Sequence, residues 1–461
     1  MKDRSRPYLV LLVVGLGTFF TAMAGSSVNL ALPPMGRELG LELERLRWVV
    51  QAFMLTTGSL LVLAGRLGDI VGHRLVYLTG YLLFGLGSLL CGMSGGFISL
   101  VVFRVLQAAG GALVLASSPA LLTLSFPGRQ RGSALGLQAT ATYLGLTLGP
   151  VLGGLLVAAL GWRWNFYFFL PTGLVVCLLG YLFLPRRTPQ VVNRQFDWAG
   201  GASFAGGMCF LLFGLTRLHR MEGWLQSWLL IAAGLGGMFF YWLHSRGRPD
   251  AVLPLSLFRS RQFAGAALSA VANYIALFCA TFLLPFVLEE GLGRKIQEAG
   301  VVLAIQPLVM ALVSSPSGWL SDRWGARGLS SLGMLIMGAA IMGMYFSLQK
   351  GLGIGELLVW LALIGLGTGV FISPNSSSLM GSAPEGRQGS AGAVLAESRV
   401  VGMFLGVALA SSIFTVAGGR TGTVWTAQDF HAAALVMLAG AVAAFTGVIT
   451  SLLRGRRKAQ E

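Results

Sequence analysis

Three charged side chains lie inside long apolar stretches of this sequence, where a charge is costly. Glu397 is the one acid of 17 that is clearly surrounded by apolar residues, and Arg104 and Arg399 are the bases in comparable positions. A charged group in the interior of a membrane costs about 2.5 to 3.5 kcal/mol on insertion scales, so such residues indicate a function. Because burial favours the neutral carboxyl, Glu397 is a candidate for reversible proton binding.

The alternative for Glu397 is a structural pairing with Arg399. Residues two positions apart on a helix do not face each other, so these side chains are expected to contact different neighbours. Arg104 and Arg399 have no acid three or four positions away, and Arg104 has only Gln107 on its own helix face. Both arginines are therefore candidates for proton coupling, for positioning a substrate or for structural contacts with another helix.

A motif with fixed Gly, Leu, Asp, Gly and Arg occurs twice, and each copy follows an apolar stretch. Residues 65–74 and 318–327 both fit G-x-L-x-D-x-x-G-x-R. Asp69 can share one helix face with Arg66 and His73. We interpret the motif as a conformational latch, with ordinary loop charge as the alternative. The latch residues are Gly65, Asp69, Gly72, Arg74, Asp322 and Arg327.

Glycines recur every four residues in one apolar stretch, at Gly145, Gly149 and Gly153, and Gly154 adjoins the last. Such a stripe permits close approach of a second helix. Pro150 lies within it and removes one backbone hydrogen bond, which bends a helix. We predict a hinge at this point, with generic helix packing as the alternative.

Several polar side chains lie in apolar stretches, where lipid would reject them. Each is a candidate either for lining a substrate cavity or for a hydrogen bond between helices. Since the chain has 28 Phe and 16 Met, such a cavity would suit a bulky hydrophobic substrate. The cavity candidates are Asn29, Gln51, Gln107, Gln138, Tyr143, Asn273, Tyr274, Gln306 and Asn375.

Metal-binding and catalytic spacings do not appear. The four Cys and four His show neither CxxC nor paired-histidine spacing, and no cluster of His, Asp and Glu has catalytic spacing. We therefore expect no enzymatic activity, no metal and no cofactor, with the proton as the coupling ion.

The composition predicts that membrane-spanning helices position these residues. Of 461 residues, 55% are apolar and 11% are charged, against about 25% charged in soluble domains, and the mean hydropathy is +0.75. This excludes a soluble enzyme, a disordered chain and a nucleic-acid-binding module. The net charge of +16 is spread over short loops, as expected from membrane topology.

Fourteen stretches are long and apolar enough to cross a membrane, which takes about 20 residues. The first follows Lys2, Arg4 and Arg6 and imitates a cleavable signal peptide, but its apolar run continues to Leu32, so we expect it to span. The predicted spans are approximately residues 8–32, 46–67, 75–93, 98–122, 134–160, 165–184, 198–215, 225–244, 264–288, 300–320, 329–348, 357–380, 390–416 and 432–453.

The repeated motif and the loop charges predict the organisation of the chain. Residues 1–185 form a first six-helix half, residues 186–250 a linker and an inserted transmembrane hairpin, and residues 251–461 a second six-helix half. This layout is typical of transporters built from parallel repeats. Lys and Arg are about twice as frequent in the segments on the side of the N-terminus, which places both termini in the cytoplasm.

The loop motif at residues 65–74 resembles the most recurrent motif of the major facilitator superfamily. The stretch from Gly145 to Gly154 resembles the motif of its exporters, and Arg104-x-x-Gln107-x-x-Gly110 resembles an arginine motif of its drug/proton antiporters. Residues 28–33 (VNLALP) and the fourteen spans are similar to its fourteen-span drug/proton antiporter branch. Arg399, three residues before a glycine, also fits that branch.

The resemblance carries one expectation for the loop motif and one departure. It implies that Asp69 contacts a helix terminus of the other half in one state, where the helix dipole favours an anion, and that Asp322 is its weaker counterpart. The branch usually has an acid a few residues before the Val-Asn pair, but this chain has Ala24. A proton-coupling role at that position is therefore not carried over.

The sequence thus predicts an all-α transporter of the bacterial inner membrane that exports hydrophobic or amphipathic compounds by alternating access and proton antiport. The missing acid at Ala24 favours one alternative, a transporter or flippase of lipids or lipid-like metabolites. A channel or a non-transporting receptor is the alternative of another class, which the repeat argues against. We expect a monomer whose partners are a small molecule or lipid and the surrounding membrane lipids.

Overall fold

The computed structural model describes residues 6–41, 43–186, 195–217, 224–248, 251–419 and 425–453. Within these ranges the chain forms helices and turns without a strand, and 14 helices are long and apolar enough to cross a membrane. This confirms the predicted fold class of an all-α polytopic membrane protein.

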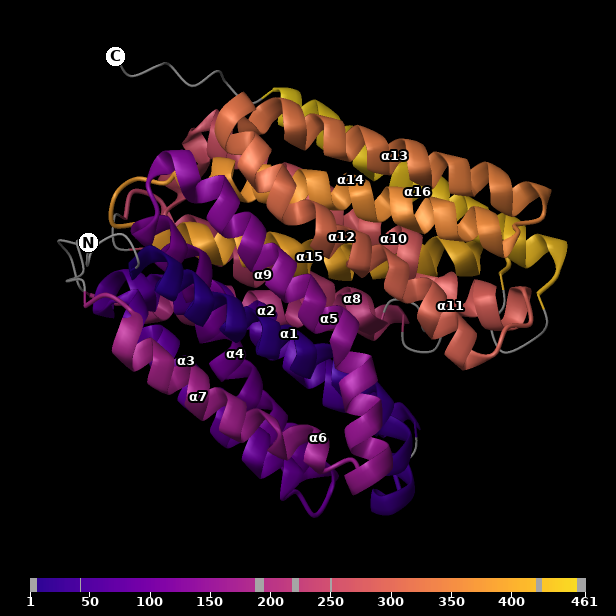
Figure 1. Ribbon diagram of the computed structural model, residues 1–461, viewed down its shortest axis with the longest axis horizontal. Coiled ribbons are helices and arrows are strands. Elements are labelled where there is room, and N and C mark those ends of the chain that lie inside the picture. Colours follow the sequence, from indigo (N-terminus) through magenta and orange to yellow (C-terminus); the bar gives the residue numbers. More distant parts are fainter. Residues whose placement is uncertain are drawn as a thin grey trace.

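Helices α1 to α7 supply the first six spans, and α10 to α16 the last six (Figure 1). The first set comprises α1 (Arg6–Leu39), α2 (Leu43–Val71), α3 (His73–Gly92), α4 (Phe97–Ser125), the 3-10 turn η1 (Gly128–Gln130), α5 (Arg131–Leu160), α6 (Trp164–Tyr167) and α7 (Phe169–Phe183). The last set comprises the 3-10 turn η2 (Leu255–Arg259), α10 (Arg261–Phe282), α11 (Leu284–Phe286), the π-helical turn η3 (Val287–Gly291), α12 (Ile296–Trp324), α13 (Ala326–Lys350), α14 (Ile354–Gly381), α15 (Gln388–Val416) and α16 (Ala427–Leu452).

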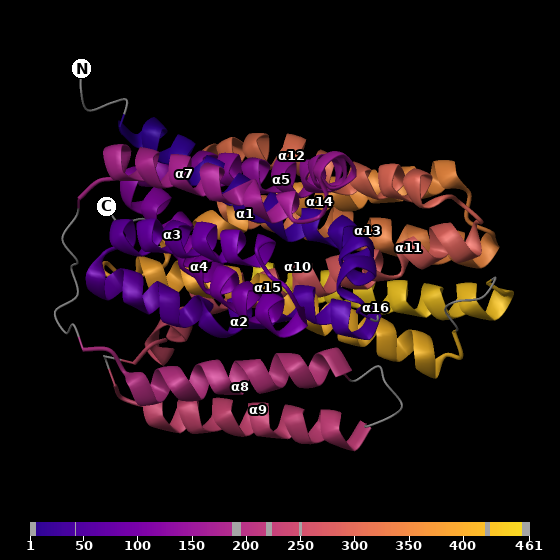
Figure 2. The same cartoon turned by 90° about the horizontal axis from the view of Figure 1, so that it is seen from below.

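The inserted hairpin consists of α8 (Trp198–Arg217) and α9 (Trp224–Ser245) and lies along one side of the bundle (Figure 2). Helix α8 packs against α2 and α15, whereas α9 packs mainly on α8. Asp197 fastens the start of the hairpin, because its carboxylate accepts the Gly200 N–H at 2.9 Å and lies 2.9 Å from Nε2 of His244. The hairpin therefore covers the seam between the two halves on one side.

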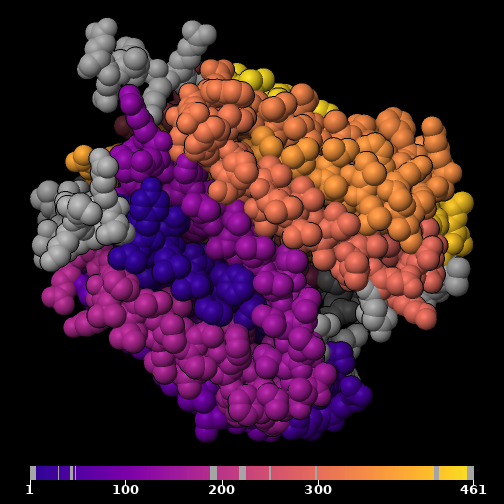
Figure 3. Space-filling view, in the orientation of Figure 1, coloured from indigo at the N-terminus to yellow at the C-terminus, as the bar shows by residue number. Residues whose placement is uncertain are grey.

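The two halves touch at one end of the bundle and separate beyond it. The first turns of α5 contact α12, where the Thr140 hydroxyl donates to the Ala311 carbonyl at 2.8 Å. Farther along α5, Gly145 and Gly153 pack on α1 of the same half. Figures 1 and 3 show the halves meeting on the left of the view and diverging toward the right. We call the touching end, with its turns at Gly72 and Gly325, the closed end.

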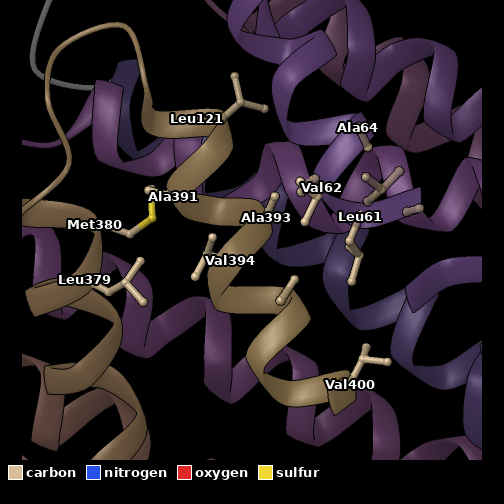
Figure 4. Packing of buried hydrophobic residues seen from close by; sticks show 14 of the residues in the cluster. Leu61, Val62, Ala64, Leu121, Leu379, Met380, Ala391, Ala393, Val394 and Val400 are labelled. Carbon is tan, nitrogen blue, oxygen red and sulfur yellow. The ribbon is translucent and has the colours of Figure 1, made fainter. Parts of the chain in front are cut away.

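Helix α15 shows the same division along its length. Gly389 packs on α2 and Gly392 on α4, both in the opposite half, whereas Gly402 and Gly406 pack on α10 in its own half. One apolar cluster bridges the halves near the closed end (Figure 4). It includes Leu61, Val62 and Ala64 of α2, Leu121 of α4, Leu379 and Met380 of α14, and Ala391, Ala393, Val394 and Val400 of α15.

Candidate functional site

Asp69, near the end of α2, binds the N-terminus of α15 in the opposite half. Its Oδ1 accepts the Gly389 N–H at 2.7 Å, and its Oδ2 accepts the Ser390 N–H at 2.9 Å and the Ser390 hydroxyl at 2.7 Å. Nε2 of His73 lies 3.5 Å from the same carboxylate. The positive end of the α15 dipole and its unpaired N–H groups favour an anion there, so the contact joins the halves electrostatically.

Asp322, at the equivalent position of the second motif, makes the matching contact with α5. Its carboxylate accepts the Gly132 N–H, the Ser133 N–H and the Ser133 hydroxyl, each at 2.8 Å. We expected a weaker counterpart of Asp69, but the donors are of the same three kinds at nearly the same distances. Each half therefore contributes one carboxylate and one helix N-terminus to the contacts that hold the closed end together.

Two glycines allow the backbones to approach closely enough for these contacts. A Cβ on Gly65 would overlap the Gly389 carbonyl oxygen and lie 2.5 Å from Cβ of Ala393. A Cβ on Gly318, the matching position of the second motif, would overlap the Gly132 carbonyl oxygen. Gly72 has a φ of 100°, a left-handed conformation that glycine adopts without strain, and makes the turn from α2 into α3.

The arginines of the two motifs bind within their own halves in this conformation, so their part in the latch stays a prediction. Arg74 donates to the Tyr181 carbonyl at 2.6 Å and lies over the Tyr181 ring. Arg327 donates to the Leu452 carbonyl. Each arginine thus binds the C-terminal end of the last helix in its own half, where the helix dipole favours a cation.

A pocket of about 90 Å³ lies between the halves and brings four of the predicted residues together. Gln138 and Tyr143 reach it from α5, Tyr274 from α10 and Arg399 from α15. The remaining lining residues are Thr18, Leu115, Pro119, Leu135, Ala139, Thr142, Ile372, Ser376, Leu395 and Ala396.

Three other cavity candidates form contacts inside the helix bundle instead. The Gln107 amide bonds Arg104 and Ser88, and the Asn375 amide donates to the Ala266 carbonyl at 3.1 Å. The Asn273 amide lies 3.3 Å from the sulfur of Met334. These three side chains hold helices together, which was the alternative role for each candidate.

The last three candidates do not line the pocket either. Gln306 is buried on α12, Gln51 is half-buried on α2, and Asn29 is exposed on α1. Sequence position alone therefore does not separate cavity residues from helix contacts.

Glu397 is buried in α15 and points away from the pocket. It is 7% exposed, and neither carboxyl oxygen has a hydrogen-bond partner among the described residues. It lies four residues after Ala393 and three before Val400, which contact Gly65 and Gly58 of α2, so helix periodicity places it on the α2 face. Arg399 lines the pocket instead, so among the described residues the two side chains have different neighbours, as their spacing of two positions predicts.

Arg104 is fully buried within the first half. Its Nε donates to the Val49 carbonyl at 2.9 Å, its Nη1 donates to Oε1 of Gln107 at 2.6 Å, and its guanidinium lies over the rings of Phe53 and Phe166. These contacts connect α4 with α2 and α6. Arg104 is therefore separate from the pocket, in surroundings that a structural role explains.

The glycine stripe of α5 faces α1. A Cβ on Gly145 would overlap the Phe19 carbonyl oxygen, and one on Gly153 would lie 2.6 Å from Cβ of Ser27. Helix α5 is continuous through Pro150 and Gly154. The close packing predicted for the stripe is thus present, while the hinge at Pro150 stays a prediction.

Sequence reasoning missed Ser133 and Ser390, which provide the hydroxyl donors of the two contacts at the closed end. A signal for them exists, because a Gly-Arg-Gln segment precedes a Gly-Ser-Ala segment in both places. The two copies are residues 128–134 (GRQRGSA) and residues 386–391 (GRQGSA).

Comparisons with known proteins agree with this architecture. The family model of the Major Facilitator Superfamily matches residues 14–261 and 266–461. The riboflavin transporter RibZ of Clostridioides difficile is 32% identical over 412 residues, covering 88% of each chain. The tetracenomycin C resistance and export protein of Streptomyces glaucescens is 30% identical over 88% of this chain and 76% of its own length. The multidrug resistance protein Stp of Mycobacterium tuberculosis is 30% identical over 88% and 75%.

Two solved structures share the fold at low sequence identity. The human organic anion transporter MFSD10 superposes with a TM-score of 0.68 and 17% identity, over 95% of this chain and 99% of its own. The proton:xylose symporter XylE gives 0.66 and 15%, over 95% of each chain.

Proposed function

This chain belongs to the major facilitator superfamily and is a multi-pass membrane transporter, and from that premise we propose that it exports hydrophobic or amphipathic compounds by alternating access and proton antiport. The observation that carries the proposal is the division of the interface between the halves: paired contacts tie one end, and a pocket lies between the halves. In this proposal the closed end faces the cytoplasm, because the loop charges favour cytoplasmic termini, and the pocket exchanges with the outside.

The two contacts at the closed end make the switch between conformations possible. Asp69 and Asp322 each bind N–H groups that belong to the opposite half, so both contacts break when that end opens. Since water then solvates the carboxylates and the helix N-termini, two states of similar free energy can exist. In this proposal the contacts hold the outward-facing state.

Glu397 is the proposed proton carrier. The carboxyl lies on the α2 face of α15, so water reaches it when α2 and α15 separate at the closed end. Protonation removes a buried charge from this interface, which lowers the cost of packing it. Proton exchange is thereby linked to the movement that carries substrate, and each charge crossing gains about 2.3 kcal/mol per 100 mV.

The relatives support the direction and breadth of transport in this proposal. Several are named for drug resistance or export, and one is named as a riboflavin transporter. The protein is accordingly proposed to act as a monomer in a bacterial inner membrane, without enzymatic activity.

Ala24 favours a second candidate function. It occupies the position of the usual acid in the first span, and it is buried in an apolar cluster with Met23, Phe84 and Phe169. Ala24 itself offers no carboxyl, which suits a transporter of lipids or lipid-like metabolites without proton coupling.

Reconstituted protein separates these functions. Purified protein in proteoliposomes is tested for movement of a fluorescent amphipathic dye and of a fluorescent phospholipid, each with and without an imposed pH gradient. Dye movement that saturates and accelerates with the gradient supports proton antiport. Phospholipid movement that ignores the gradient supports the second function, and dye flux without saturation contradicts a transporter in favour of a channel.

A further inference from the structure

The pocket between the halves has one charged side chain, Arg399. Acidic residues are absent from its lining, although the pocket collects side chains from six helices. The other polar side chains of the lining carry hydroxyls or an amide, and they include Tyr143, Tyr274 and Gln138. The pocket therefore presents a positive charge surrounded by groups that can donate hydrogen bonds.

Arg399 is not neutralised by a neighbouring carboxylate. Glu397 lies on the α2 face of the same helix and does not line the pocket. Among the residues that the structure describes, no ion pair or hydrogen bond with Arg399 is present, and the Tyr143 phenol lines the same pocket. A guanidinium so placed inside a membrane protein is costly unless a ligand or water satisfies it.

The size and lining of the pocket are suited to binding the charged group at one end of an otherwise apolar ligand. The space of about 90 Å³ has room for a carboxylate, which is smaller than the benzene ring that a closed cavity of roughly 150 Å³ holds. Leu115, Ile372 and Leu395 supply apolar walls beside the polar groups. An anion would pair with Arg399, whereas a cation would add a second positive charge to a site without an acid.

We propose that this pocket binds the anionic group of an amphipathic substrate, with Arg399 as its charge partner and Tyr143, Tyr274 and Gln138 as hydrogen-bond donors. This rests on the proposed export function and narrows its substrates to amphipathic anions.

Two dyes with the same xanthene ring system and opposite charge test the proposal. Fluorescein is anionic at pH 8, and rhodamine 6G is cationic. Binding of each to the purified full-length protein is measured by fluorescence anisotropy for the parent, Arg399→Gln and Arg399→Lys. Arg246→Gln is the matched control, because Arg246 stacks on Trp242 of the hairpin and lies outside the pocket.

The parent is expected to bind fluorescein at least about tenfold more tightly than rhodamine 6G, as charge-assisted hydrogen bonds warrant. Arg399→Gln should remove this preference, Arg399→Lys should keep part of it, and Arg246→Gln should leave it intact. The elution profile in size-exclusion chromatography and thermal unfolding verify that each variant is folded. If a variant does not fold, the comparison of the two dyes on the parent still tests the proposal.

Three results overturn the inference: equal or tighter binding of rhodamine 6G by the parent, no binding of fluorescein by the parent, or equal loss in the Gln and Lys variants. Because the experiment measures binding and not transport, the charge preference of the pocket and the proposed export function can be contradicted independently. Arg399-dependent binding of fluorescein in a protein that transports nothing would contradict export and leave the charge preference of the pocket standing.

Discussion

Asp69 and Ser390, 321 positions apart in the chain, are joined by two hydrogen bonds, from the Ser390 N–H at 2.9 Å and from its hydroxyl at 2.7 Å to the same carboxylate oxygen. Asp322 and Ser133 repeat this arrangement on the other side of the interface. The closed end is thus held by two contacts of nearly equal geometry.

Asp69→Asn is expected to leave folding and membrane insertion intact while slowing transport. Hydrogen bonds to a charged group contribute about 1.5 to 3 kcal/mol, and an amide keeps one acceptor oxygen but loses the charge that the helix dipole favours. Asp322→Asn should slow transport to a similar degree, since its contacts match. Flux in proteoliposomes provides the measurement, with exposed Glu385→Gln as the control. Parental flux in both Asn variants would remove the latch assignment.

Gly149→Leu is expected to block transport by separating α5 from α1. A Cβ alone would overlap the Ser26 hydroxyl and lie 2.8 Å from the Met23 carbonyl oxygen, and overpacking of this kind costs about 1 to 3 kcal/mol. The matched control is Gly206→Leu in α8, where no atom lies within 4 Å of an added Cβ. Thermal unfolding and flux are compared. If Gly149→Leu retains both, the stripe is not a tight contact.

Glu397→Gln is expected to abolish the response of transport to a pH gradient while substrate binding survives. The amide imitates the protonated carboxyl and cannot release a proton, and it lies outside the pocket lining. Flux is measured with and without the gradient, again with Glu385→Gln as the control. A variant that responds like the parent would place coupling elsewhere, at exposed Glu289, at Glu290, which accepts a hydrogen bond from Trp425, or outside proton exchange.

Arg104→Lys is expected to lower stability without changing the response to the pH gradient. Lysine cannot reproduce the bonds to the Val49 carbonyl and to Gln107 together with the stacking on Phe53, and the loss should be about 1 to 3 kcal/mol. Thermal unfolding reports stability, and gradient-driven flux reports coupling. Unchanged stability with a lost gradient response would restore Arg104 as a coupling residue.

Glu38→Gln is expected to destabilise the protein at neutral pH, and its difference from the parent is expected to be smaller at pH 4. Hydrogen bonds from Arg163 and Trp162 hold the pKa of the Glu38 carboxyl below its ordinary value of 4.5. A lowered pKa in the folded state contributes stability above 4.5, which is lost as the pH falls through the folded-state value. Melting temperatures of parent and variant at pH 7.5 and pH 4 measure this; a gap that widens in acid would contradict it. The effect is small because Glu38 is half exposed.

The amino-acid sequence by itself determined the class of the protein, its fourteen spans and the repeated motif. Hydropathy over about 20 residues is a local property, so a membrane span is visible without knowledge of its neighbours. The glycine stripe of α5 is local too, since Gly145, Gly149 and Gly153 must share a helix face whatever packs against them. The motif predicted that Asp69 meets a helix terminus, but only through the family resemblance.

Only the tertiary structure decided which polar side chains meet. Gln107 and Gln138 are equally polar residues in equally apolar helices, yet one bonds Arg104 and the other lines the pocket. The difference depends on which helix face meets which neighbour, and those neighbours are far apart in the chain. For the same reason the sequence could not show that the contacts of Asp322 match those of Asp69, or that Arg74 binds within its own half. It also could not show that the halves are in contact at one end, because each of these features follows from the packing of whole helices.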